Sequence, residues 1–196
     1  MQREEHSSFT LVALKGPSSM GMIRLIDSLM QSEETDFRVE IVNEPIQVRK
    51  RMLDGSADFV ILPTTMAALT YNKGLEYQLI AIPVWGTLYL TGTDTSLFGW
   101  NLLKGKKVHS MARGMSPDVV FRHLLNKNGL DTENDVTLDY RFPTHIDLAH
   151  AVAAGQAGYA ILSEPQLSVA MHRNPDLKPL LNLNEAWMQH HGAPMA

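Results

Sequence analysis

The chain has 196 residues, of which 44% are hydrophobic, and these values suit one larger domain or two small α/β lobes. Its formal net charge of −4 is weak and not clustered, so the sequence predicts no nucleic-acid partner. Cysteine is absent, which excludes a disulfide framework, a thiol nucleophile and a zinc–thiolate site. The sequence contains no run of about 18 apolar residues, so no membrane span is predicted.

The first predicted unit is a strand, a tight turn and an amphipathic helix. Phe9–Leu14 is a short apolar run rich in strand formers. Four apolar residues then recur at helical spacing, namely Met22, Leu25, Ile26 and Leu29. Between these elements, Ser18 and Ser19 follow a Gly-Pro pair, and we expect their hydroxyls to cap the helix. Free N–H groups at the carboxyl end of such a strand favour a bound anion, whereas the alternative is a well-capped connection without a ligand.

Residues 16–21 have the G-x-x-x-x-G spacing of a nucleotide phosphate loop. Met22 and Ile23, however, stand where that loop requires Lys and then Ser or Thr. No G-x-G-x-x-G motif occurs either. A nucleotide-binding loop is therefore excluded at this turn.

After a solvated turn at residues 31–36, two strands and two helices are predicted in alternation. They cover Phe37–Val42, residues 45–55, residues 57–62 and residues 64–72. Pro45 is typical of a helix start, and Gly55 is typical of its end. The second of these strands ends at Pro63, where Thr64 and Thr65 supply hydroxyls at the next helix cap. A second polar loop is thus expected at the carboxyl end of a strand.

Residues 77–91 form a long β-prone run that we interpret as a connection between two lobes. Pro83 and Gly86 are expected to bend it. Trp85 and Tyr89 suit stacking on a planar ligand, and packing in the core is the alternative for both.

The second half shows a similar succession of elements. Strands are predicted at residues 108–111, 136–140 and 159–162, and helices begin near residues 116, 145 and 167. Ser116 is the expected N-cap of the first of these helices, with Pro117 at its first helical position. Residues 175–196 are weakly patterned, so no element is predicted there.

An internal repeat relates the two halves. Residues 51–64 and 151–165 share a helix end, a glycine stop, an aromatic-plus-aliphatic strand and a polar cap, and the loop at 16–20 has a partner at 114–117. Each half therefore reads β-α-β-α-β-α, and right-handed crossovers predict two parallel sheets. If the halves face each other, four polar loops converge on one cleft. The alternative to two related lobes is that the similarity of the halves only reflects the general similarity of βαβ units.

Five motifs carry a family resemblance, at residues 13–22, 55–64, 102–108, 128–137 and 155–165. In order and spacing the chain resembles the ABC-transporter solute-binding proteins of the nitrate/sulfonate/taurine and thiamine-precursor type, which have the periplasmic-binding-protein type 2 fold. The resemblance implies a two-lobed α/β fold, each lobe a small, mostly parallel sheet flanked by helices. It implies a first lobe at residues 1–88, ending in the connector, and a second lobe at residues 89–196 with an incomplete C-terminus.

The same resemblance implies the extracytoplasmic solute-binding component of an ABC importer. Such a protein binds a small organic anion or heterocycle between its lobes and delivers it to a membrane permease, with no catalytic residue, cofactor or metal. A periplasmic protein or a membrane-anchored lipoprotein is expected, its leader lying outside this sequence, because residues 1–8 are too polar for a secretory signal. The solute and the oligomeric state stay open.

The candidate ligand-binding residues lie in the four polar loops and on the connector, namely Ser18, Ser19, Met20, Thr64, Thr65, Trp85, Arg113, Gly114, Ser116 and Glu164. Helix N-termini and hydroxyls suit an oxyanion, and Arg113 offers it a bidentate contact. Glu164 suits an amine or a ring N–H, and its alternative is an acid in the first turn of a helix, favoured by the helix dipole.

Two other classes of protein are weighed against this one. Small cytoplasmic enzymes that make menaquinone or thiamine precursors share the fold, but the sequence has no cysteine, no G-x-S-x-G elbow and no H-E-x-x-H helix. His145 and His150 are five residues apart, a poor fit for one helix face, and His190 and His191 lie in the weakly patterned tail. A ligand-sensing domain of a regulator is the third class, but no helix-turn-helix segment accompanies it.

Overall fold

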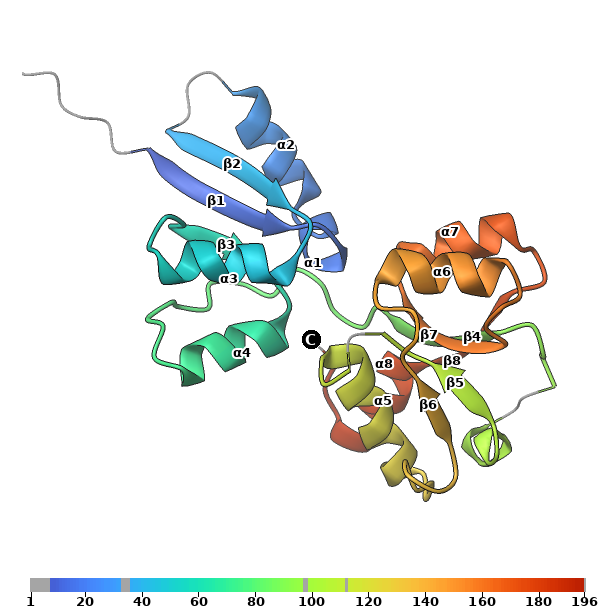
Figure 1. The fold of residues 1–196 in the computed structure, drawn as a ribbon. Coiled ribbons are helices and arrows are strands. Elements are labelled where there is room, and N and C mark those ends of the chain that lie inside the picture. The colour runs from blue at the N-terminus through green and yellow to red at the C-terminus, as the bar shows by residue number, and fades with distance from the viewer. Residues whose placement is uncertain (1–7, 33–35, 97–98, 112, 196) are drawn as a thin grey trace, which may run out of the picture. The chain divides into compact units, whose positions relative to one another are not determined.

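The structure, a computed structural model, describes residues 8–32, 36–96, 99–111 and 113–195. Its contacts divide the chain into two units, Met1–Val84 (unit 1) and Trp85–Ala196 (unit 2) (Figure 1). The turn predicted at residues 31–36 lies partly outside the described residues, and the polar start at residues 1–8 lies almost wholly outside them. The assignment of residues 1–88 and 89–196 to two functional lobes stays a prediction.

Unit 1 is a three-stranded parallel sheet, in the order β2-β1-β3, flanked by helices. Its elements are β1 (Phe9–Leu14), α1 (Pro17–Met20), α2 (Ile23–Gln31), β2 (Phe37–Val42), α3 (Pro45–Leu53), β3 (Phe59–Ile61) and α4 (Thr64–Asn72). Successive residues of β1 face opposite sides of the sheet. Leu11 and Ala13 pack with Ile26 of α2, whereas Val12 and Leu14 pack in a second cluster with residues of α3.

Unit 2 is a five-stranded sheet in the order β6-β5-β7-β4-β8. Its strands are β4 (Leu88–Gly92), β5 (Lys107–His109), β6 (Thr137–Asp139), β7 (Tyr159–Ser163) and β8 (Lys178–Asn182). Its helices are the short 3-10 helix η1 (Trp100–Leu103), α5 (Ser116–Lys127), α6 (His145–Ala153), α7 (Gln166–Arg173) and α8 (Leu183–His191). β5, β6 and β7 are parallel, and β4 runs antiparallel to both of its neighbours.

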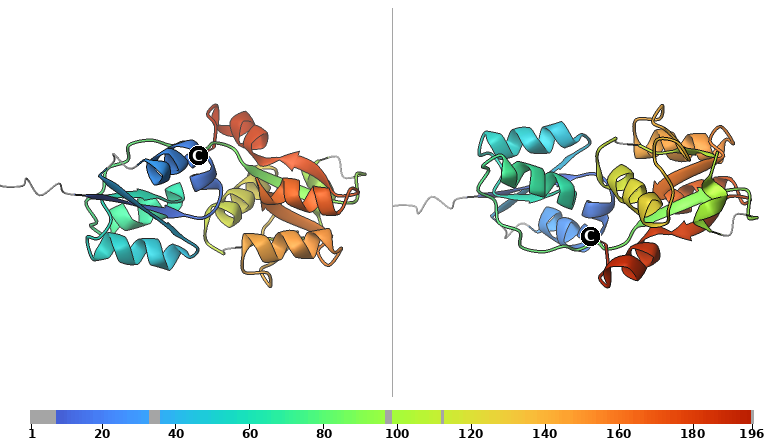
Figure 2. Two further views of the ribbon diagram at one scale, coloured as in Figure 1. Left: turned by 90° about the horizontal axis from the view of Figure 1, so that it is seen from above. Right: turned by 90° about the horizontal axis from the view of Figure 1, so that it is seen from below.

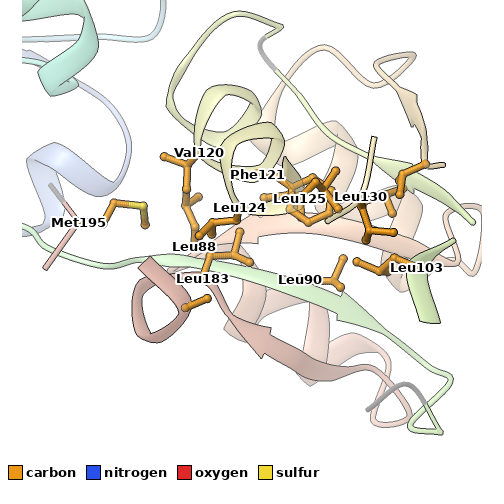
Figure 3. Close-up of a cluster of buried hydrophobic side chains, with 14 residues drawn as sticks. Leu88, Leu90, Leu103, Val120, Phe121, Leu124, Leu125, Leu130, Leu183 and Met195 are labelled. Atoms are coloured by element: carbon orange, nitrogen blue, oxygen red, sulfur yellow. The ribbon is translucent and has the colours of Figure 1, made fainter. Parts of the chain in front are cut away.

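Helices cover both faces of the sheet of unit 2 (Figures 1 and 2). On one face, Leu88 and Leu90 of β4 pack with leucines of α5 and with Leu183 of α8 (Figure 3). On the other face, Ala160 and Leu162 of β7 pack with α6 and α7. A sheet buried on both faces explains why these strands read as nearly continuous apolar runs.

Most predicted elements are confirmed. The strands Phe9–Leu14 and Phe37–Val42 occur with the predicted bounds, and α3 begins at Pro45 with a capping box formed by Glu44 and Gln47. Gly55 and Gly155, the repeated helix stops, both adopt positive φ, as the end of a helix requires.

Three expectations about elements are wrong. The sheet of unit 2 is not wholly parallel, because β4 from the connector enters it in the opposite direction. Of the β-prone run at residues 77–91, only the part from Leu88 onward is a strand. Residues 175–196 are not unstructured, since they hold β8 and α8, and His190 and His191 lie in the last turn of α8. Leu25 does not face the core but is exposed, whereas Ile26 is buried.

The predicted caps also differ from the structure. The N-cap residues of α1, α4 and α5 are Gly16, Pro63 and Met115, and none makes a side-chain cap hydrogen bond. The serines and threonines that were expected as N-caps, Ser18, Ser19, Thr64, Thr65 and Ser116, therefore lie within the first turns of these helices and not at the N-cap position. Among the described residues, no helix is both long and apolar enough to cross a bilayer.

Candidate functional site

Three parallel strands of unit 2 end at one edge of the sheet, and a helix begins shortly after each. Residues 110–111 and 113–115 lie between β5 and α5, residues 140–144 lie between β6 and α6, and Glu164 and Pro165 lie between β7 and α7. The carboxyl edge of a parallel sheet is where α/β proteins bind ligands, because the N–H groups of the first helical turns face it. This edge is the candidate site of unit 2.

A histidine and a serine contact each other at this edge. His145, the first residue of α6, lies with Nδ1 at 3.2 Å from Oγ of Ser163, the last residue of β7. Ser163 is only 2% exposed. Burial lowers the pKa of His145, which favours the neutral imidazole. If the serine hydroxyl donates to Nδ1, then the proton of the neutral ring is on Nε2, which makes that atom a hydrogen-bond donor.

The position of His145 follows from the residue before it. Thr144 is the N-cap of α6, and its Oγ1 accepts a hydrogen bond from the Asp147 N–H at 3.1 Å. The same hydroxyl donates to the Asp147 carboxylate at 2.7 Å. This closed turn holds the first residue of the helix at the end of the sheet.

The loop before α5 is held by a buried carboxylate. Asp118 is 4% exposed, and it accepts hydrogen bonds from the Gly114 N–H at 2.7 Å, from Arg122 Nε at 2.8 Å and from the Tyr140 hydroxyl at 2.5 Å. Burial alone would raise the pKa of Asp118, but these three hydrogen bonds outweigh burial and keep the pKa below its usual value. The loop at 113–115 is therefore fixed to both α5 and the end of β6.

Two arginines line a shallow depression beside this network. The Arg113 guanidinium lies 5.5 Å from the centre of the Tyr140 ring, a cation–π contact. Arg122 also donates to Glu133 at 3.0 Å and to Tyr140 at 3.0 Å. The depression has a volume of about 220 Å³, and both arginines, Glu133 and Tyr140 contribute to its wall. Arg113 itself is exposed, so its charge is available to an anion at this edge.

Glu164 lies just before α7 and contacts a residue of that helix. Its carboxylate accepts hydrogen bonds from the Ser168 N–H at 3.1 Å and from the Ser168 hydroxyl at 2.8 Å. Glu164 precedes the N-cap residue Pro165, so the alternative of an acid inside the first turn is wrong, although its carboxylate does accept from an N–H of that turn. The interaction of Glu164 with an amine ligand stays a prediction. Close by in sequence, Oε1 of Gln166 is buried without a hydrogen-bond partner in the described part of the chain. Such an atom is a candidate contact for water or a ligand.

In unit 1, the other candidate residues lie at the equivalent edge of the smaller sheet. Ser18, Ser19 and Met20 belong to α1, where the Ser19 hydroxyl donates to the Leu14 carbonyl and so closes the turn after β1. Thr64 and Thr65 are the first two residues of α4. Met20 is half exposed, and Ser18 is partly exposed.

A basic side chain occupies the loop after the middle strand of each β-α-β-α-β set. Lys15 follows β1 in unit 1, and Arg113 comes four residues after β5 in unit 2; both are exposed. Each of these loops thus places a positive charge near the N-terminus of a helix.

The structure gathers the predicted residues within each unit only. Arg113, Gly114, Ser116 and Glu164 share the carboxyl edge of unit 2, and Ser18, Ser19, Met20, Thr64 and Thr65 share that of unit 1. Trp85, half exposed, is the first residue of unit 2, and Tyr89 of β4 packs against the core. The convergence of all four loops on one cleft stays a prediction.

Sequence reasoning missed the most specific contacts of the site. It weighed His145 only for its spacing from His150 when an enzyme was considered, and it did not select Asp118 or Tyr140. It placed Ser163 in one of the four polar loops but did not select it as a ligand contact. The available signal was that His145 and Ser163 both stand where a predicted strand gives way to a predicted helix. In the four described stretches of the chain, no group of three or more His, Cys, Asp or Glu residues is arranged to hold a metal ion.

A family model matches residues 18–185 of the chain, and its description is "ABC transporter, phosphonate, periplasmic substrate-binding protein". Because the match covers most of the chain, the chain belongs to this family of substrate-binding proteins. The match includes every residue proposed above as a ligand contact.

Solved structures and a curated relative agree with that membership. The chain is similar to an ABC transporter protein from Parabacteroides distasonis, at 28% identity and a TM-score of 0.74 over 91% of this chain and 60% of that one. It is also similar to the periplasmic aliphatic sulphonate binding protein SsuA from Escherichia coli, at 16% identity and a TM-score of 0.70 over 96% of this chain and 60% of that one. These likenesses confirm the predicted fold class, the two-lobed periplasmic-binding-protein fold.

The curated relative is the putative binding protein YtlA of Bacillus subtilis (strain 168). It is 33% identical over 84 residues, which are 43% of this chain and 25% of that protein. The chain thus spans a quarter of this relative and about three fifths of the two solved structures.

Proposed function

We propose that this chain acts as the extracytoplasmic solute-binding component of an ABC importer and binds a small organic oxyanion of the phosphonate or sulfonate class. The observation that carries the proposal is the family match over residues 18–185, which spans the carboxyl-edge loops of unit 2 and, in unit 1, Ser18 to Met20 and the start of α4. A membrane permease is the proposed partner, and the periplasm or the outer face of a membrane is the proposed location. A lipid anchor belongs to the same proposal.

The chemistry of the two edges supports an oxyanion. Oxygen atoms of a phosphonate or sulfonate accept hydrogen bonds from backbone N–H groups at helix N-termini, and a guanidinium or ammonium group balances their charge. α5, α6 and α7 begin at the edge of unit 2, where Arg113 supplies the charge, and Lys15 does so in unit 1. Ser18, Thr64, Thr65 and Ser116 are the proposed hydroxyl donors.

The His145–Ser163 pair gives the proposed site its most specific donor. A neutral imidazole that accepts from Ser163 through Nδ1 offers an N–H at Nε2, which suits an anionic oxygen without adding a full charge. Trp85 supplies an apolar surface for the organic part of the solute, and Glu164 is the proposed contact for an amine where the solute carries one.

In the proposed function the protein binds the solute and does not convert it chemically. A serine beside a histidine is also the contact between a nucleophile and its general base. Attack on a substrate, however, needs an accessible Oγ, and Ser163 is 2% exposed. The matched proteins are substrate-binding components of transporters. Mass spectrometry of a solute incubated with the protein should therefore recover it unchanged.

The test is isothermal titration of the chain with methylphosphonate, 2-aminoethylphosphonate, methanesulfonate and taurine. At least one should bind, and His145→Ala should weaken that binding about 10- to 100-fold, the loss of one hydrogen bond to a charged group. Ser163→Ala should weaken it less, about 2- to 10-fold, because it removes only the hydroxyl that contacts the imidazole. His150→Ala is the matched control, because His150 is exposed in the last turn of the same helix. Equal affinity of the unsubstituted chain and all three variants would refute the site. No binding of any of the four solutes would refute the solute class.

A further inference from the structure

Two helices of unit 2 bring two histidine side chains together outside the candidate solute site. α5 and α8 pack on the same face of the sheet, where Leu124 of α5 and Leu183 of α8 belong to one core cluster. His123 lies within α5, and His191 is the last residue of α8. Their Nε2 atoms are 2.8 Å apart, although 68 positions separate the two residues in the sequence. The packing of the helices therefore creates a pair of imidazoles that the proposed function does not use.

The indole of Trp187 positions both rings of this pair. Its centre lies 4.2 Å from that of the His191 ring and 5.3 Å from that of the His123 ring. Trp187 and His191 are four residues apart on α8 and so share one face of the helix. Trp187 packs against the core cluster, whereas His191 is exposed. The pair is thus supported from below by a packed ring and is accessible from solvent.

The spacing of the two nitrogens suits a shared metal ion. Imidazole nitrogen is a preferred ligand of Cu²⁺, Ni²⁺ and Zn²⁺. With metal–nitrogen bonds of about 2.0 Å, two such ligands lie about 2.9 Å apart at a right angle and about 3.3 Å apart at a tetrahedral angle. The distance of 2.8 Å between the Nε2 atoms of His123 and His191 is closer to the right angle, which is typical of Cu²⁺.

Both Nε2 atoms must be free of protons to bind a metal ion. Burial and the neighbouring charges of His191, Lys127 and His190 lower the pKa of His123, which favours its neutral form. In the hydrogen bond between two neutral rings, one Nε2 carries a proton. When an ion binds, that ring releases the Nε2 proton to water and takes one up at Nδ1, so both rings stay neutral and each offers a lone pair at Nε2.

The end of α8 also favours a cation. His191 lies directly before the C-cap residue Gly192, in the turn whose carbonyl groups end the helix. The partial negative charge of these carbonyl groups attracts positive charge to the last turn of a helix. A metal ion on His191 lies at this end of α8.

We propose that His123 and His191 together bind one divalent transition-metal ion, and that Cu²⁺ fits their spacing best. The ion replaces the hydrogen bond between the two rings and links α5 to the last turn of α8. Because no third His, Cys, Asp or Glu completes a metal-binding group in the part of the chain that the structure describes, water fills the remaining coordination positions. Two protein ligands and bound water make an exchangeable site rather than a closed structural one.

The probe is Cu²⁺ added to the full chain without an affinity tag at pH 7.5, and the readout is tryptophan fluorescence. Cu²⁺ quenches a nearby indole, and Trp187 lies against both histidines. Quenching should saturate at about one equivalent of Cu²⁺, and EDTA should reverse it. His123→Ala and His191→Ala should each raise the Cu²⁺ concentration for half of the quenching about 10-fold or more, because each removes one of two ligands.

Two further variants serve as controls. His172→Ala removes an exposed histidine from the last turn of α7 and should titrate like the unsubstituted chain. Trp187→Phe keeps an apolar ring beside the pair but removes the indole, so it should lose most of the quenching and still bind about one Cu²⁺ in calorimetry.

Three results would overturn the proposal. Unchanged titrations of His123→Ala and His191→Ala would show that the pair does not hold the ion. An equal loss of affinity in His172→Ala would show that Cu²⁺ binds histidines in general. Full quenching in Trp187→Phe would place the ion elsewhere. None of these results bears on solute binding, so the proposed function is tested separately.

Discussion

At the scale of single residues, the carboxyl edge of unit 2 depends on a few buried polar groups that hold loops in place. Asp118 joins the N–H of Gly114, the guanidinium of Arg122 and the hydroxyl of Tyr140 around one buried carboxylate. Three donors to a buried carboxylate compensate for the loss of its hydration. The exposed Arg113 thus stands on a loop whose backbone is fixed one residue away.

Replacing this carboxylate should destabilise the protein. Asp118→Asn removes the charge and an acceptor, and we expect the free energy of unfolding at pH 7 to fall by about 2–4 kcal/mol in urea titrations. Because the folded pKa of Asp118 lies below its usual value, its contribution is present above about pH 4 and is lost as the pH falls further. The difference between the two proteins should therefore shrink in acid.

The control for this variant is Glu133→Gln. Glu133 contacts the same Arg122 at 3.0 Å, but its side chain is 77% exposed, so this change should alter stability by about 0.5 kcal/mol or less. An Asp118→Asn protein as stable as the control would contradict the buried network.

At the scale of elements, the last helix is held to α5 by aromatic and imidazole rings. Nε2 of His123 in α5 and Nε2 of His191 in α8 are 2.8 Å apart, a distance at which one nitrogen donates and the other accepts. The Trp187 ring lies 4.2 Å from His191 and 5.3 Å from His123, centre to centre. The contact requires at least one neutral imidazole.

This contact should make stability depend on pH near neutrality. Burial and the neighbouring charges of His191, Lys127 and His190 lower the pKa of His123, so the folded chain binds this proton more weakly than the unfolded chain. Stability should then fall as the pH drops through about 6.5. Urea midpoints at pH 7.5 and pH 5.5 measure this loss.

Two variants separate this pair from other histidines. His191→Ala should reduce the difference between the two midpoints, whereas His172→Ala, in the last turn of α7, should retain it. If both variants showed the same difference between the midpoints at pH 7.5 and pH 5.5, the His123–His191 pair would not be the source of the pH dependence.

The elements also show which parts of a sequence pattern are reliable. Long apolar periods and glycine stops predicted α3, α5 and α6 well, because these signals are local. β8 and α8 were missed because the strand passes directly into the helix at Asn182, which both ends β8 and caps α8. Without an intervening turn, residues 178–191 show neither period clearly.

At the scale of the whole molecule, the two units differ in how completely they bury their apolar residues. Of the large apolar side chains that are exposed among the described residues, twelve belong to unit 1 and six to unit 2. Unit 1 is also the shorter unit and has three strands against five. A smaller core leaves less free energy to oppose the loss of conformational entropy.

The units should therefore unfold separately, unit 1 first. The three tryptophans, Trp85, Trp100 and Trp187, all belong to unit 2, so their fluorescence reports unit 2, whereas far-ultraviolet circular dichroism reports both units. In urea, the circular dichroism signal should begin to change at a lower concentration than the fluorescence signal. Coincident transitions for the two probes would contradict this prediction and indicate one cooperative unit.

The sequence by itself determined the order of most elements, the α/β class, the internal repeat and the loops at the ends of parallel strands. These features follow from periodicity, helix stops and turn residues, which act over a few positions. The tertiary structure alone decided that β4 pairs antiparallel with β7, some 70 residues away, and that His145 meets Ser163. It also decided that the Ser19 hydroxyl binds the Leu14 carbonyl. The reason is that strand partners and buried hydrogen bonds depend on which distant groups share one surface, and a local pattern carries no record of that choice.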